Sequence, residues 1–275
     1  MPEVMLPLTV RDLTAADCRR ASGQGRPPTS RASPGHWTAK DYGSTLPDLP
    51  ITPVFHSEGD GGTYFFTRWL ASVFPRQWNA FCDRVHPGIT PPCGPTEFYP
   101  QFGRARGENG AGNVVSYIAS RAGNGAIGYD EDSYALLTRL PVAALRNPAG
   151  KYVQPTDASI GTALTQAVIN EDAGSRNFLQ QNLTKLYSYQ NPGSYPLASY
   201  SYLIVPRAGT TLPTNFTRAK GRTLSAFVVQ ALCQGQQQLG QLGYASLPGN
   251  LVSGELIQAE HIPGHGPIPS PSQCQ

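Results

Sequence analysis

Residues 56–67 read HSEGDGGTYFFT, a glycine-rich loop that opens directly into the aromatic-rich run YFFTRWLASVF (64–74). Apolar side chains recur at helical spacing through this run, which predicts an amphipathic helix over residues 63–74. The first amide groups of a helix have no partner within it, and the helix dipole favours negative charge there. The stretch therefore predicts an anion-binding loop at a helix start, although it carries two acidic residues, Glu58 and Asp60.

The chain around this loop alternates between strand and helix patterns. A β-branched run predicts a strand near residues 50–55, and Pro75 either ends the first helix or begins a second one. GENGAGNVVSYIAS (107–120) repeats the pattern of a glycine-rich loop that opens into a helix. Further elements are predicted as strands at 125–130 and 195–206 and as helices at 159–169 and 223–241, the last capped by Thr223. This alternation predicts an α/β fold.

Composition and motifs exclude several classes of function. A net charge of +3 without a Lys/Arg run argues against a nucleic-acid partner. We expect no metal ion and no cofactor, because the chain has no CxxC pair, no histidines at zinc spacing and no P-loop. No catalytic motif is present, so we expect a protein that is not an enzyme. A hydrolase that uses His56 with Glu58 or Asp60 is the weaker alternative.

The five cysteines suit an exported protein. Cys82 and Cys93 flank the proline-rich loop CDRVHPGITPPC, a short closure that favours a disulfide, although two unrelated buried thiols are the alternative. Cys233 and Cys274 form the weaker second pair. The chain has no apolar run long enough to span a membrane, and its first twenty residues lack the pattern of a signal peptide.

Five motifs, in order, resemble the substrate-binding proteins of phosphate ABC transporters. They are WTAKDYGSTLPDLPITPV, HSEGDGGTYFFTRWL, GNGAIGYDEDSYAL, YPLASYSYLIVP and TLSAFVVQALCQGQQQLGQLGYASLPGNLV. The resemblance covers residues 37–258. It implies a two-lobed type II periplasmic-binding-protein fold, in which two lobes close on the ligand through hinge strands.

The resemblance also implies a division of the chain. Residues 37–194 correspond to the second lobe with the anion loop, and residues 195–275 correspond to the return strand and the C-terminal part of the first lobe. Residues 1–36 match nothing in the family, and we expect them to be disordered or an artefact of the gene model. Because the family begins with a further half-lobe, we expect the first lobe to be incomplete and this chain alone to bind ligand poorly.

The resemblance places the ligand on the glycine-rich loop. Matched without gaps, His56 falls on the family's arginine, Glu58 on its aspartate and Asp60 on its serine. A planar guanidinium fits phosphate oxygens, whereas histidine is mostly neutral above its ordinary pKa of about 6.5. The same match puts Gly61 on a family glycine and Gly62 on its threonine, and Thr63 supplies a hydroxyl if the register slips by one residue.

Two readings of the loop stay open at this point. Either it still holds an anion, or Asp60 merely caps a helix that begins near Gly61 or Gly62. Outside the loop, Asn113 is a helix cap rather than a ligand, and Arg104 and Arg106 are read as solvated surface. Residues 130–132 are read as a solvated turn, although a family glutamate matches Glu131.

The resemblance implies an extracytoplasmic, monomeric protein that captures inorganic phosphate or a similar small anion and delivers it to an ABC permease. The alternative is a surface-attached domain of the same fold, with a degenerate anion site that binds another ligand or none.

Overall fold

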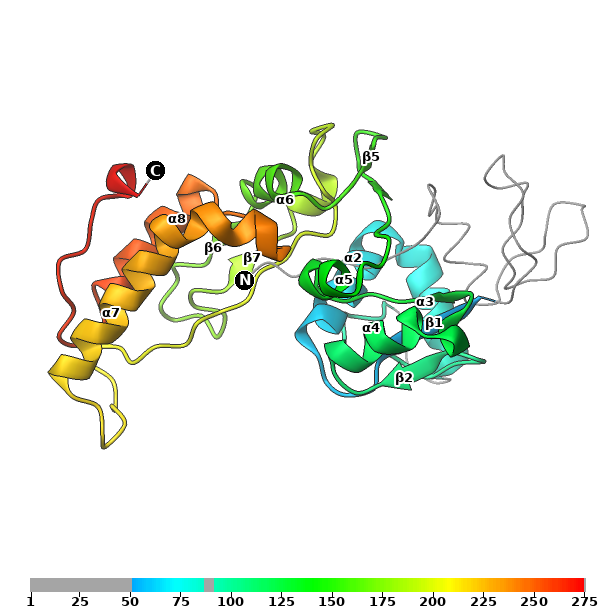
Figure 1. Cartoon of the computed structure of the whole chain (residues 1–275), viewed down its shortest axis with the longest axis horizontal. Coiled ribbons are helices and arrows are strands. Elements are labelled where there is room, and N and C mark those ends of the chain that lie inside the picture. Colours follow the sequence, from blue (N-terminus) through cyan, green and yellow to red (C-terminus); the bar gives the residue numbers. More distant parts are fainter. Residues whose placement is uncertain (1–50, 87–91, 275) are drawn as a thin grey trace, which may run out of the picture.

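The computed structural model describes residues 51–86 and 92–274 (Figure 1). The expectation for residues 1–36 therefore falls outside the described part of the chain. Helices α2 to α5 and strands β1 to β3 lie at one end of an elongated molecule, and helices α7 and α8 lie at the other (Figure 1). Helix α6 and strands β6 and β7 lie between them.

A three-stranded parallel sheet supports the end that carries the glycine-rich loop. Its order is β2-β1-β3, with the bounds β1 Thr52–His56, β2 Arg106–Glu108 and β3 Ala126–Ile127. The central strand pairs in parallel with both neighbours, with Val54 opposite Arg106 and Thr52 opposite Ala126. Because all three strands run the same way, the residues that follow them emerge at one edge of the sheet.

Two consecutive helices follow the loop, as the sequence predicts. Helix α2 spans Gly61–Val73 and helix α3 spans Pro75–Val85, with Phe74 between them. Pro75 occupies the first turn of α3, where its missing N–H costs no helical hydrogen bond. Their apolar faces are buried at Trp69, Leu70, Trp78 and Phe81 in the main hydrophobic core. Burying each such side chain stabilises the fold by about 1.5–3 kcal/mol.

Five further α-helices and two short antiparallel strand pairs complete the regular elements of the described residues. Helix α4 spans Ala111–Ala119, α5 Asp132–Thr138, α6 Asp157–Leu164, α7 Arg218–Leu232 and α8 Gly249–Ala259. Strands β4 (Leu145–Arg146) and β5 (Tyr152–Val153) form one antiparallel pair, and β6 (Val168–Ile169) and β7 (Gln181–Asn182) form another. The expected helix at 159–169 is thus only partly right: it begins earlier, capped by Thr156, and stops five residues early.

Two expectations for the C-terminal part are wrong. Residues 195–206 form no strand, and Leu203 and Ile204 are 61% and 93% exposed, because no neighbouring strand pairs with them in the described part of the chain. The long helix begins at Arg218 with Thr217 as its cap, because the Thr217 side chain accepts the amide of Lys220. Thr223 lies inside this helix and donates to the carbonyl of Ala219.

The cysteine pairing also differs from the expectation. Cys233 and Cys274, the weaker predicted pair, form a disulfide with 4.3 Å between their Cα atoms. Cys82 and Cys93, the preferred pair, are free thiols in the structure, and both are buried. Burial and a hydrogen bond to Cys93 raise the pKa of the Cys82 thiol to about 12, so Cys82 stays a neutral thiol. Residues 87–91 of the segment between them lie outside the described part.

Within residues 51–86 and 92–274, no helix combines the length and apolar character that a membrane span requires. The same residues contain no cluster of three or more metal-ligating side chains arranged for a metal ion.

Candidate functional site

The glycine-rich loop joins the carboxyl end of β1 to the start of α2. His56 is the last residue of β1 and only 4% of its surface is exposed, while Asp60 is the N-cap of α2. The side chain of Asp60 accepts the amide of Thr63 at 2.5 Å. The helix-cap reading of Asp60 is therefore confirmed. The cap does not remove Asp60 from the site, because its carboxylate also lines the cavity described below and lies 3.9 Å from His56 Nδ1.

Glu58 occupies the start of a second helix. Its Oε1 lies 3.1 Å from His56 Nδ1 and accepts the amide of Gly110, the N-cap of α4, at 2.7 Å. Burial by itself would raise the pKa of this carboxyl, but hydrogen bonds from His56 and from the backbone outweigh it and lower the pKa. A carboxylate of the protein itself thus satisfies a helix-start amide that could otherwise bind an anion.

Asp130 faces His56 from the neighbouring strand end. It follows β3, and its side chain is only 3% exposed, so the expected solvated turn is wrong at this residue. Oδ1 accepts the amide of Glu131 at 2.9 Å, and Oδ2 lies 3.7 Å from His56 Nε2. Burial raises the pKa of Asp130 to about 7, and the charges of Asp60 and Glu131 add to this, while His56 opposes it.

Glu131 and Asp132, the other two acids of this turn, are not fully exposed to solvent either. Glu131 Oε2 accepts the hydroxyl of Tyr244 at 2.7 Å, which ties the site to a residue more than a hundred positions along the chain. Asp132 begins α5, is 9% exposed, and has a pKa that burial raises to about 6.

Thr63 is structural rather than a donor to a ligand. It is fully buried, and its hydroxyl lies 2.6 Å from the hydroxyl of buried Tyr129. Gly62 lines the cavity, whereas Thr63 and Gly61 do not, so the ligand role of these two residues stays a prediction that the cavity lining does not support. The helix begins at Gly61, which turns the Thr63 side chain inwards.

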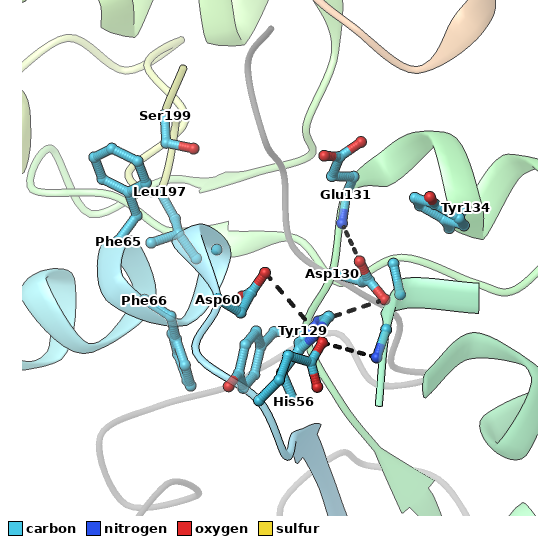
Figure 2. Close-up of a pocket in the computed structure, with 14 residues that line it drawn as sticks. His56, Asp60, Phe65, Phe66, Tyr129, Asp130, Glu131, Tyr134, Leu197 and Ser199 are labelled. Carbon is cyan, nitrogen blue, oxygen red and sulfur yellow. Dashed lines mark hydrogen bonds and ion pairs between the residues drawn. The ribbon is translucent and has the colours of Figure 1, made fainter. Parts of the chain in front are cut away.

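These groups surround a cavity of about 250 Å³ (Figure 2). Figure 2 shows the side chains of His56, Asp60 and Asp130 gathered at its centre, with Phe65 and Phe66 from α2 on one side and Glu131 and Tyr134 on the other. The lining comprises His56, Glu58, Asp60, Gly62, Phe65, Phe66, Gly110, Ala111, Tyr129, Asp130, Glu131, Tyr134, Leu197 and Ser199.

Four carboxylates and one imidazole meet in this cavity, and among the described residues that line it there is no Lys or Arg. Arg106 instead pairs with Glu108 and lies over the ring of Tyr117, with its side chain 53% exposed. Arg104 is exposed as well, so both arginines are surface residues as expected. Asn113 is neither cap nor ligand, because Gly110 caps α4 and the Asn113 amide donates to Asn109.

The chain matches the family model of a PBP superfamily domain over residues 32–231. The chain belongs to the PBP superfamily. Curated relatives of this PBP-superfamily chain include the phosphate-binding protein PstS of Xylella fastidiosa, 30% identical over 210 residues, and that of Methanocaldococcus jannaschii, 28% identical over 211 residues. These matches cover 76% and 75% of this chain but 50% of each relative, so the chain spans half the length of these relatives.

Solved structures with a similar fold include two phosphate-binding proteins. One is a high-affinity periplasmic phosphate-binding protein, PfluDING, with a TM-score of 0.54 and 18% identity, covering 92% of this chain and 68% of that one. The other is a human phosphate-binding apolipoprotein, with a TM-score of 0.53 and 15% identity, covering 96% and 75%. These likenesses confirm the expected α/β binding-protein fold, while the division of the chain at residue 195 stays a prediction.

Proposed function

We propose that this PBP-superfamily chain belongs to a solute-binding protein that captures phosphate outside the cytoplasm and passes it to an ABC permease. The relatives' names support phosphate as the ligand, and those relatives are about twice as long as the stretch they share with this chain. A monomeric protein that binds its ligand without catalysing a reaction is consistent with these relatives.

The observation that carries this proposal is the position of the cavity. It opens at the carboxyl edge of the parallel sheet, between the glycine-rich loop after β1 and the start of α4. In open α/β sheets, ligands bind outside the carboxyl ends of the strands. Gly62, in the first turn of α2, brings a helix start without a side chain to the cavity wall.

The charges of the cavity determine the form of phosphate that it accepts. Two like charges about 4 Å apart repel by roughly 4 kcal/mol at an effective dielectric of 20, so a dianion beside ionised Asp60 and Glu58 is disfavoured. Phosphate shifts to its singly charged form as the pH falls, and this form is repelled less by the acidic lining of the cavity. The singly charged anion is therefore the proposed bound state.

One observation favours the second candidate function, a domain of this fold whose anion site is degenerate. Glu58 already accepts the Gly110 amide that an anion would need, and it sits against His56. If this internal pairing is permanent, the domain binds another ligand or none.

Calorimetric titration with phosphate at pH 5.5 and pH 8 tests the proposal. One arm uses the 275-residue chain, and the other uses a chimaera in which the remaining segment of the Xylella fastidiosa relative precedes residue 37 and supplies an opposite cleft wall. We expect phosphate to bind both, more tightly in the chimaera and more tightly at pH 5.5. Absence of heat in both arms at both pH values supports the degenerate site. A separate assay with a chromogenic phosphate ester tests for catalysis, and turnover would indicate an enzyme.

A further inference from the structure

Asp130 has an unsatisfied polar atom that none of the other roles in the site explains. Its side chain is 97% buried, and Oδ2 has no hydrogen-bond partner within the described part of the chain. His56 Nε2 lies 3.7 Å from this oxygen, which is beyond hydrogen-bonding reach. Figure 2 shows the Asp130 carboxyl beside His56 near the centre of the cavity.

The groups that face Asp130 come from three elements. His56 ends β1, Asp60 begins α2, and Glu131 is the next residue along the chain. Asp60 and Glu131 disfavour the ionised carboxylate, and His56 favours it. The start of α4 and residues 197–199 contribute only uncharged residues to the cavity wall, Gly110, Ala111, Leu197 and Ser199.

A buried carboxylate oxygen without a hydrogen bond is costly, and a proton removes most of that cost. The direction in which burial shifts the pKa of Asp130, to about 7, agrees with this. Once protonated, however, the carboxyl becomes a donor that itself needs an acceptor. The described residues supply none to Oδ2, whereas an oxyanion in the cavity presents several acceptor oxygens.

We infer that Asp130 is a ligand residue that donates its proton in a hydrogen bond to the bound anion, so that capture of phosphate by this chain takes up a proton from solution. This inference rests on the proposed function. The only bond that forms is the O–H bond of the Asp130 carboxyl: its proton comes from solvent and is donated in a hydrogen bond to a phosphate oxygen. Asp130 thereby selects for ligands that accept hydrogen bonds and makes affinity depend on pH.

The test compares the chain with Asp130→Asn, whose amide is a permanent donor, and with Asp130→Ala, which has none. Asp132→Asn is the matched control, because Asp132 is also buried but does not line the cavity. Phosphate titrations at pH 8 and pH 5.5, each in two buffers of different ionisation enthalpy, give both the affinity and the number of protons taken up. Comparing variants removes the contribution of phosphate's own titration.

At pH 8, one unit above its pKa, Asp130 is only about 10% protonated, so we expect the unmodified chain to take up about 0.9 proton more per phosphate than Asp130→Asn. Asp130→Asn should bind about tenfold more tightly than the unmodified chain at pH 8, since one pKa unit is a factor of ten, and equally at pH 5.5. Asp130→Ala should bind phosphate more weakly than the unmodified chain at both pH values. Asp132→Asn should equal the unmodified chain in affinity and in proton uptake.

The possible outcomes test the role of Asp130 and the proposed function separately. Phosphate binding with the same proton count and affinity in Asp130→Asn as in the unmodified chain overturns the role of Asp130 and leaves the proposed function standing. If neither the chain nor any variant binds phosphate at either pH, both the inference and the proposed function are overturned. Far-ultraviolet circular dichroism and melting curves establish that each variant is folded.

Discussion

Glu58 places a carboxylate oxygen 2.7 Å from the amide nitrogen of Gly110, so a side chain of the protein satisfies the N-terminal end of helix α4. The same oxygen lies 3.1 Å from His56. Glu58 therefore holds the two groups, a helix-start amide and an imidazole, that an incoming anion would use. Competition between this internal carboxylate and the ligand is the main property that distinguishes the cavity from a simple anion site.

Glu58→Ala should expose both groups to the ligand. We expect phosphate affinity at pH 8 to rise about tenfold, well below the roughly 4 kcal/mol of close repulsion because solvent screens the partly exposed carboxylate. The free energy of unfolding should fall by about 1–3 kcal/mol, as charged hydrogen bonds are lost. Glu97→Ala is the control, because exposed Glu97 carries the same charge and does not line the cavity. Unchanged affinity in Glu58→Ala would contradict the competition.

His56→Arg combined with Asp60→Ser should strengthen phosphate binding at pH 8 by more than the sum of the two single changes. His56 Nδ1 lies 3.9 Å from Asp60, so the residues are coupled neighbours. Serine remains a good N-cap for α2, so helix stability should change little, whereas Asp60→Ala should cost about 1 kcal/mol. Calorimetry and denaturant unfolding of the unmodified chain, the two single variants, the double variant and Asp60→Ala check this. Strictly additive effects on affinity would mean that the two side chains act separately.

Thr63→Val should affect stability without changing ligand binding. The Thr63 hydroxyl lies 2.6 Å from Tyr129 in a buried pair, and its loss leaves the tyrosine hydroxyl unsatisfied. We expect unfolding to become easier by about 1–3 kcal/mol. Tyr129→Phe with Thr63→Val should recover part of this loss, because both polar partners are then removed. A large loss of phosphate affinity with unchanged stability would restore Thr63 as a ligand.

The free energy of unfolding should fall as pH rises towards 7, because Asp130 in the folded chain loses its proton over this range. Its folded pKa of about 7 lies above the ordinary value of 3.8, so the folded state binds this proton more tightly than the unfolded state. The resulting stabilisation is fully present below about pH 4 and is lost as pH rises through about 7. A shift of three pKa units corresponds to about 4 kcal/mol, and we expect the free energy of unfolding to fall by about 2–4 kcal/mol.

Asp130→Asn removes this titration, so its stability relative to the unmodified chain should increase between pH 4 and pH 8. Urea unfolding at several pH values measures the difference. Asp83→Asn, a change at an exposed helix position, provides the control for loss of a carboxylate elsewhere. Parallel stability curves for the unmodified chain and Asp130→Asn would show that the carboxyl is ionised throughout.

The disulfide and the two free thiols lead to a further prediction. Cys233→Ser with Cys274→Ser should lower the free energy of unfolding by about 2–4 kcal/mol, because the bond closes a loop between cysteines 41 residues apart. Alkylation in denaturant without reductant should label Cys82 and Cys93 and spare the other pair. Labelling of Cys233 and Cys274 with protection of Cys82 and Cys93 would reverse the pairing seen in the structure.

Local sequence signals predicted the elements on either side of the glycine-rich loop. The strand near 50–55, the helix after the glycine-rich loop and the restart at Pro75 all follow from periodicity and from the fixed backbone of proline. Residues 195–206 have strand composition, but a strand also needs a partner for its backbone, and this is a property of the fold rather than of the segment.

The site was predicted only in part, for a similar reason. The loop indicated His56, Glu58, Asp60 and Gly62, but not that Glu58 reaches Gly110, 52 residues away. Asp130 was missed because three consecutive acids suggest solvent exposure. The signal that would have found it is its position at the end of the strand predicted over 125–130, since the carboxyl ends of parallel strands converge on one edge of the sheet.

The most direct test of the account locates phosphate on the protein. The chain is labelled with ¹⁵N-glycine and titrated with phosphate at pH 5.5 and at pH 8 while amide resonances are followed by nuclear magnetic resonance. We predict saturable shifts of Gly62 and Gly110, the glycines that line the cavity at the starts of α2 and α4, with tighter saturation at pH 5.5. Gly209, in a turn outside the cavity lining, should stay unshifted. Saturation that leaves Gly62 and Gly110 unmoved, or no response at either pH, would contradict the account.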